Sequence, residues 1–140
     1  MKLLDANVWL AAAWANHEHH KVVQRWLDSE EEELGFCRLT QLAFLRLVSN
    51  VAVTGAYALT RREAWDAFDA LAGDVRVRFL EEPAGLILLW RTYSKREDRS
   101  HNVWTDDYLA AFAQASDATL VTLDRGVEKR YPSVTVLRVR

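Results

Sequence analysis

The chain has 140 residues, of which 50% are hydrophobic and 27% charged, which is typical of one globular domain. Because 18 Lys and Arg face 20 Asp and Glu, the net charge of −2 excludes an overall basic protein, and any nucleic acid must bind at a local patch. The single Cys excludes an internal disulfide, and no apolar run reaches transmembrane length. We therefore predict one domain over residues 1–140, cytoplasmic and without a signal peptide or membrane anchor.

Strands and helices alternate along the predicted chain. In order we expect a strand at residues 1–4, a helix soon after residue 5, a helix at about 17–28, a strand at 34–39, a helix that opens at 40–41, a connection at 50–60, a helix at 61–72, a strand at 75–80, a helix from residue 83, a helix from residue 105, and strands at 119–123 and 134–139. The strand at 75–80 alternates Val with Arg, which favours a sheet edge. The whole order predicts a mainly parallel sheet with helices on both faces.

Acidic residues stand at the ends of predicted strands and at the start of one helix. Asp5 follows the first strand and Asp124 follows the strand at 119–123. Thr105 is a predicted helix cap, and the carboxylates of Asp106 and Asp107 behind it meet the positive end of the helix dipole. In open α/β sheets, ligands bind outside the carboxyl ends of strands, so we expect the acids to share one rim. A helix-capping role is the alternative for Asp5.

Gln41 is a polar residue on a predicted apolar helix face. Phe44, Leu45 and Val48 follow it at the spacing of one helix side. A polar side chain in such a place needs a partner or a ligand. The two interpretations are a hydrogen bond to a neighbouring loop and an oxygen donated towards a metal ion or its water.

Carboxylates gathered at one rim repel one another unless a cation compensates them. Asp5, Asp106 and Asp124 therefore predict a hard divalent ion, Mg²⁺ or Mn²⁺, and the lack of Cys or His partners argues against structural zinc. Such an ion activates water and offsets charge on a phosphodiester. These residues, with Gln41, are the predicted catalytic set of a metal-dependent phosphodiester hydrolase.

Two other charged clusters have plainer interpretations. Three His and one Glu at residues 17–20 invite a metal site, but their spacing is not that of known zinc helices, and a solvated loop is favoured. The basic residues at 91–99 lie next in sequence to the acidic helix start and predict contact with an anionic substrate.

Four segments resemble the motifs of PIN-domain ribonucleases, and most closely the VapC-type toxins of bacterial toxin–antitoxin systems. They are residues 3–10 (LLDANVWL), 39–46 (LTQLAFLR), 104–111 (WTDDYLAA) and 120–125 (LVTLDR). The resemblance covers essentially the whole chain. It implies a PIN-like three-layer α/β/α domain with a central, mainly parallel sheet. It also implies a Mg²⁺- or Mn²⁺-dependent endoribonuclease that cleaves RNA, forms a homodimer and is held inactive by a VapB-like antitoxin.

The resemblance assigns roles to five residues. Asp5, Asp106 and Asp124 match the acids that hold the metal ion in that family. Asn7 and Thr122 match the polar residues commonly found beside these acids.

Gln41 departs from the family pattern, because it stands where such toxins usually carry Glu. Its oxygen can still bind Mg²⁺ or orient a water, but it adds no charge and cannot act as a base. Asp107, where the family more often has a small residue, is a candidate for the missing charge and a further metal ligand. Neighbours on a helix point about 100° apart, however, so a capping or solvent role for Asp107 is the alternative.

Three functions stay open from the sequence. The first is an active ribonuclease toxin, and the second is a PIN domain weakened by Gln41 that acts by binding RNA or a protein. The third is a Mg²⁺-dependent phosphoacceptor domain, which is disfavoured because the middle strand ends in Glu81 and Glu82 and the last strands offer Arg125 in place of Lys.

The sequence also predicts where an antitoxin binds. Six Trp exceed what a core of this size needs, and aromatic residues commonly anchor interfaces. We expect the N-terminal helices and the Ala52–Trp65 region to form this surface, with core packing as the alternative for any single Trp.

Overall fold

The computed structural model describes residues 1–140. Its five strands are β1 (Lys2–Leu4), β2 (Leu34–Phe36), β3 (Val77–Phe79), β4 (Thr119–Thr122) and β5 (Val136–Arg138). Its helices are α1 (Ala6–Ala13), α2 (His20–Ser29), α3 (Arg38–Val48), α4 (Val51–Thr54), the 3₁₀ helix η1 (Gly55–Tyr57), α5 (Arg61–Ala72), α6 (Leu86–Ser94), α7 (Trp104–Ala115) and α8 (Val127–Arg130).

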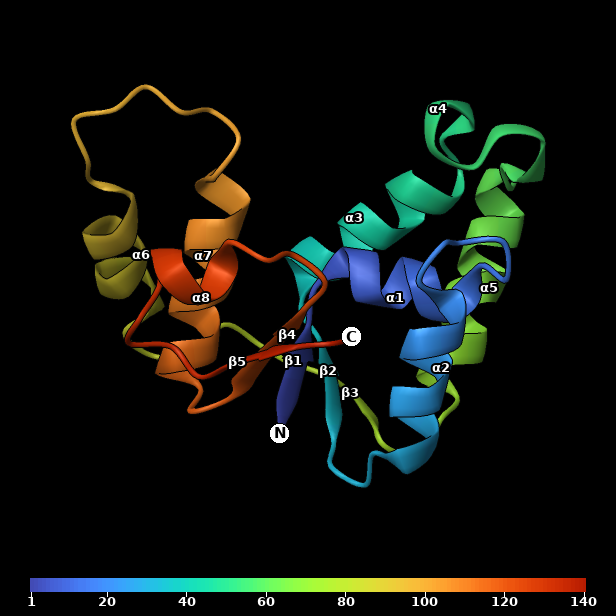
Figure 1. Cartoon of the computed structure of the whole chain (residues 1–140), viewed down its shortest axis with the longest axis horizontal. Coiled ribbons are helices and arrows are strands. Elements are labelled where there is room, and N and C mark those ends of the chain that lie inside the picture. Colours follow the sequence, from blue (N-terminus) through green and yellow to red (C-terminus); the bar gives the residue numbers. More distant parts are fainter.

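All strands are parallel and lie in the order β3-β2-β1-β4-β5. Figure 1 shows α1, α2, α3 and α5 on one side of the sheet and α6, α7 and α8 on the other. The predicted α/β class is therefore confirmed, as is the edge position of β3. Because the chain continues from β1 to β2 on one side and reaches β4 on the other, the strand order reverses at β1, the place where open α/β sheets bind ligands.

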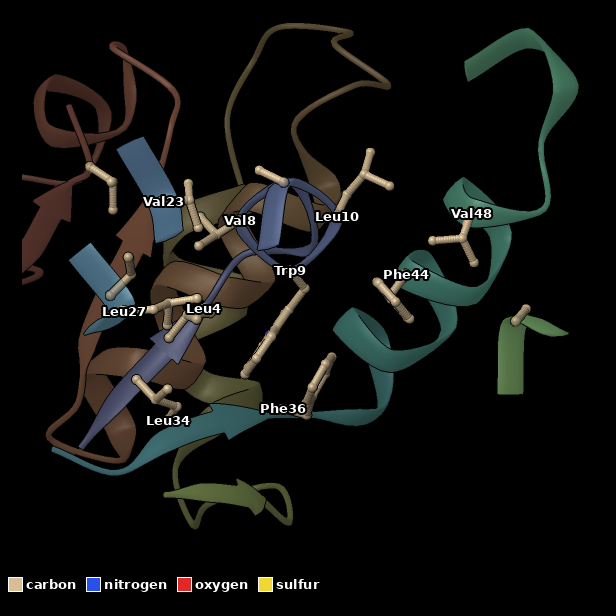
Figure 2. Packing of buried hydrophobic residues seen from close by; sticks show 14 residues of the cluster. Leu4, Val8, Trp9, Leu10, Val23, Leu27, Leu34, Phe36, Phe44 and Val48 are labelled. Atoms are coloured by element: carbon tan, nitrogen blue, oxygen red, sulfur yellow. The ribbon is translucent and has the colours of Figure 1, made fainter. Parts of the chain in front are cut away.

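Two hydrophobic clusters hold the helices against the sheet. One contains Trp9 of α1, whose ring stacks on Phe36 at a centroid distance of 3.9 Å (Figure 2). The other surrounds α7, where Ala110, Ala111 and Ala113 are fully buried. Small side chains let α7 lie close to the sheet, which fixes the position of its first turn.

Several predicted boundaries were wrong. Helix α7 begins at Trp104 with Val103 as its cap, so Thr105 is not the cap. Helix α3 begins two residues early, because the hydroxyl of Thr40 accepts the N–H of Cys37 at 3.0 Å and closes the first turn from inside the helix. Strand β2 consequently ends at Phe36.

The predicted connection at residues 50–60 also contains structure, the short helices α4 and η1. Helix α6 begins at Leu86, after Gly85 with a φ of 83°, and not at Pro83. No single helix is both long and apolar enough to cross a membrane; α3 together with the α4–η1 segment reaches that length and composition, but the two are bent by 64°.

Candidate active site

Asp5 joins β1 to α1. Its backbone N–H donates to Val121 of β4 at 2.9 Å, which ties it to the neighbouring strand. Its carboxylate accepts the N–H of Ala6 at 2.7 Å and faces the hydroxyl of Thr122 at 3.5 Å. Asp5 therefore lies at a strand end, as predicted, and also caps α1, so the two interpretations hold together.

Asp106 and Asp124 meet at a common partner. Asp106 lies in the first turn of α7, and Asp124 follows β4, where its carboxylate accepts the N–H of Gly126 at 2.7 Å. Arg130 of α8 donates from Nη2 to Asp106 at 2.9 Å and to Asp124 at 3.0 Å. The hydroxyl of Thr122 accepts the N–H of Asp124 at 3.0 Å, so the predicted residue Thr122 contacts both Asp5 and the Asp124 backbone.

The pKa values of the three carboxylates are shifted in different directions. Burial raises the pKa of Asp5 to about 6, and the charges of Asp106 and Asp124 add to that rise. Burial also raises the pKa of Asp106, although Arg130 opposes the shift. The hydrogen bond from the N–H of Gly126 lowers the pKa of Asp124, and Arg130 lowers it further. These mutual effects show that the three acids share one electrostatic environment.

Asp5 and Asp106 line an open cavity of about 310 Å³. The other lining residues are Ala6, Asn7, Ala43, Arg46, Leu47, Asn50 and Thr105. Asn7 therefore lies beside Asp5, as predicted.

Arg46 and Asn50 also line this cavity, although the sequence did not point to either residue. Ala43, Arg46 and Leu47 lie on one face of α3, at the spacing i, i+3 and i+4, and Asn50 follows the end of that helix as the cap of α4. Arg46 makes no ion pair, so a cation stands free next to the acids. The signal that identifies this face is a small residue followed three positions later by a basic one, Ala43 and Arg46, on the helix whose first turn holds Thr40.

The structure does not bring Gln41 and Asp107 to this cavity. Gln41 is buried on the core side of α3, and its oxygen accepts a bond from Arg38 at 2.5 Å. Asp107 is buried in the second cluster, where it accepts bonds from Tyr131 at 2.6 Å and Arg96 at 3.2 Å. Both polar side chains already have partners.

The donor chemistry of the acidic side chains suits a hard divalent ion. All three are carboxylates, and Asp5, whose pKa is raised by burial first and then by the charges of Asp106 and Asp124, has no cation of its own. As the side chains stand, no three His, Cys, Asp or Glu residues lie close enough to hold one ion together. That includes the histidines of residues 17–20, in which His20 Nδ1 bonds the backbone oxygen of Ala11 at 2.7 Å.

The sequence is similar to known ribonucleases along most of its length. A family model described as the PIN domain matches residues 2–131. The ribonuclease VapC41 of Mycobacterium tuberculosis is 44% identical over 130 residues, which cover 89% of each chain. The ribonuclease VapC37 of the same organism is 33% identical over 132 residues, covering 89% of this chain and 88% of that protein.

Solved structures have the same fold. VapBC2 from Rickettsia felis, bound to a DNA fragment from their promoter, matches with a TM-score of 0.72 and 17% identity over 99% of this chain and 98% of that chain. FitAcB from Neisseria gonorrhoeae matches with a TM-score of 0.61 and 26% identity over 99% of this chain and 97% of that chain.

Proposed function

We propose a mechanism for a chain that belongs to the PIN domain family, within which it is a VapC-type ribonuclease toxin of a toxin–antitoxin system. In this proposal Asp5, Asp106 and Asp124 form the catalytic centre for hydrolysis of an RNA phosphodiester. The observation that carries it is the cavity of about 310 Å³, in which two of these acids face the unpaired cation Arg46.

The cavity combines acids that suit a metal ion with a basic side chain that suits a phosphate. The acids of the centre would hold Mg²⁺ or Mn²⁺, which, when bound, activates a water and offsets charge on the reacting phosphate. Arg46 of α3 and Asn50, which caps α4, would bind the phosphate oxygens of the RNA backbone by charge and hydrogen bonding. Thr122 orients Asp5 and Asp124, because its hydroxyl contacts both residues.

The test is cleavage of structured RNA with Mn²⁺ by the wild type and by Asp5→Asn. We expect at least a hundredfold loss of rate in Asp5→Asn, the order of effect seen when a central catalytic group is removed. Asp66→Asn is the matched control, because Asp66 is an exposed acid on α5 without an ion pair, and its rate should stay within twofold. Equal cleavage by Asp5→Asn and the wild type would remove the site assignment.

The alternative function is a PIN domain with weak or absent catalysis that acts by binding RNA or protein. One observation favours it: α3 brings no carboxylate to the cavity, because Gln41 bonds Arg38 and Ala43 lines the wall. RNA retention by a wild type that does not cleave any tested RNA would support this alternative.

Two apolar surfaces support the expected protein partners. The first comprises Trp65, which is 49% exposed beside a cavity of about 300 Å³ between α3 and α5, and Tyr57, which is 62% exposed beside a smaller cavity of about 80 Å³. It falls in the predicted Ala52–Trp65 region, and the ring of Trp14, which follows α1, lies 6.4 Å from that of Tyr57. We assign this surface to a VapB-like antitoxin, because exposed aromatic side chains beside an apolar groove suit an anchored peptide.

The second surface comprises Leu42 and Trp104, which are each 53% exposed. Both line a cavity of about 340 Å³ between α3, α6 and α7, and we assign this surface to a second copy of the chain in a homodimer.

Paired variants separate the two assignments. Trp104→Glu should convert a dimer to a monomer in sedimentation and leave antitoxin binding intact. Trp65→Glu should leave the dimer intact and abolish antitoxin binding. The probe for the antitoxin is the product of any small reading frame found to adjoin the gene of this chain. A dimer in both variants would contradict the second assignment.

A further inference from the structure

Arg130 lies between two of the three acids of the proposed centre. Its Nη2 donates to Oδ2 of Asp106 at 2.9 Å and to Oδ2 of Asp124 at 3.0 Å. Asp5, the third acid, has no ion pair. One guanidinium therefore compensates two carboxylates, and it uses the oxygen atoms that a divalent ion would also need.

The backbone provides space for this guanidinium. A Cβ at Gly126 would lie 2.6 Å from Nη1 of Arg130, so any side chain at residue 126 would push the guanidinium aside. The N–H of Arg130 donates to the oxygen of Gly126 at 3.1 Å, and the buried side chains of Val127 and Tyr131 anchor the same short helix. The contact of Arg130 with both acids is thus built by the turn after β4, because glycine there leaves the guanidinium room.

We propose that Arg130 is a positioning residue that holds Asp106 and Asp124 together in the metal-free chain and releases them when a divalent cation binds. The guanidinium and the cation then compete for the same carboxylates. A guanidinium suits this role because it is always charged, is weakly hydrated and bridges two oxygens. The inference rests on the proposed function, and it adds that Arg130 sets the metal concentration at which the centre fills.

The experiment is calorimetric titration of Mn²⁺ alone into the full chain and three variants. Arg130→Gln should bind Mn²⁺ about tenfold more tightly than the wild type, equivalent to ~1.4 kcal/mol. Gly126→Ala keeps the charge but moves the guanidinium, so its affinity should rise by a smaller factor. The φ of Gly126 is −87°, which alanine adopts without strain, so Gly126→Ala tests the proposal if Arg130→Gln does not fold. Lys129→Gln removes an equal charge from the same helix without touching either acid, and its affinity should stay within twofold.

A second measurement needs no bound metal. In EDTA, Arg130→Gln should melt below the wild type, because Asp106 and Asp124 lose their shared partner, and excess Mn²⁺ should close the gap. Equal or weaker Mn²⁺ binding by both Arg130→Gln and Gly126→Ala would overturn the proposal, as would an equal gain in Lys129→Gln. Failure of the proposed function shows separately, as equal RNA cleavage by the wild type and Asp5→Asn.

Discussion

Asp106 and Asp107 are neighbours on α7, yet they belong to two different regions of the molecule. Asp107 is 1% exposed and accepts bonds from Tyr131 and Arg96 inside the second hydrophobic cluster. Asp106 faces the open cavity with Asp5, and its only ion pair is with Arg130, which it shares with Asp124. A single step along the helix thus separates a carboxylate with two donors of its own from one that shares its ion-pair partner.

Of the two carboxylates, only Asp106 is available to bind an ion. A buried carboxylate with two donors is stabilised in place, and releasing its partners costs free energy. A carboxylate whose pKa is raised by burial and by other acids is stabilised when a cation binds next to it. We therefore expect substitutions in the Asp107 region to change stability and substitutions in the cavity to change metal binding.

The largest expected effect on stability is that of Asp107→Ala. Loss of this buried carboxylate leaves the hydroxyl of Tyr131 without its acceptor and frees Arg96 from α7, so the free energy of unfolding should fall by about 3 kcal/mol. Urea denaturation in EDTA measures the change, with Asp106→Ala as the neighbouring control. A loss in Asp106→Ala as large as that in Asp107→Ala would erase the distinction between the two regions.

The next effect is a pH dependence that belongs to the cavity. The pKa of Asp5 is about 6 in the folded chain and 3.8 as its ordinary value, so between these values the folded state holds a proton that the unfolded state has released. Its contribution is full below pH 3.8 and is lost as the pH rises through 6. The free energy of unfolding of the wild type relative to Asp5→Asn should fall by about 2 kcal/mol from pH 4 to pH 7 without metal. A flat difference in urea denaturation would contradict the raised pKa.

The order of strands and helices and the three-layer fold were predictable, because alternating apolar runs and the four motifs lie at separations that set the topology. Boundaries were less so. Thr105 is a residue type that often caps helices, but α7 already begins at Trp104, with Val103 as its cap. Thr40 works from inside its helix, and a sequence pattern does not distinguish these two uses of a hydroxyl.

The candidate site was predicted in part. Helical periodicity correctly put Gln41 on the apolar face with Phe44, but it does not tell which face of α3 meets the acids. Arg130 stands 24 residues from Asp106 on a four-residue helix, so only the packed structure brings the two together. Arg96, in the basic segment at 91–99, pairs with the buried Asp107, a use that its position in the sequence does not reveal.

Ala43→Glu adds an acid to the cavity and leaves the Asp107 region unchanged. Ala43 lines the wall next to Asp5 and Asp106, so a carboxylate there should increase the uncompensated charge and raise Mn²⁺ affinity about tenfold. Leu42→Glu is the matched control, because Leu42 precedes it on α3 and is exposed outside this cavity. Calorimetry compares the two, and equal affinities would mean that the cavity is not where the metal ion binds.

The smallest effect is expected for Gln41→Ala. This variant tests whether Gln41 behaves like the buried Asp107 or like the acids of the cavity. Its oxygen is satisfied by Arg38, as Asp107 is by Tyr131, so its loss should lower the free energy of unfolding by about 1 kcal/mol. Because Gln41 is absent from the cavity lining, Mn²⁺ affinity and the RNA cleavage rate should stay within twofold. Gln41→Glu should pair with Arg38 and also leave the Mn²⁺ affinity unchanged. A tenfold change in Mn²⁺ affinity in either variant would contradict this prediction and restore Gln41 as a candidate metal ligand.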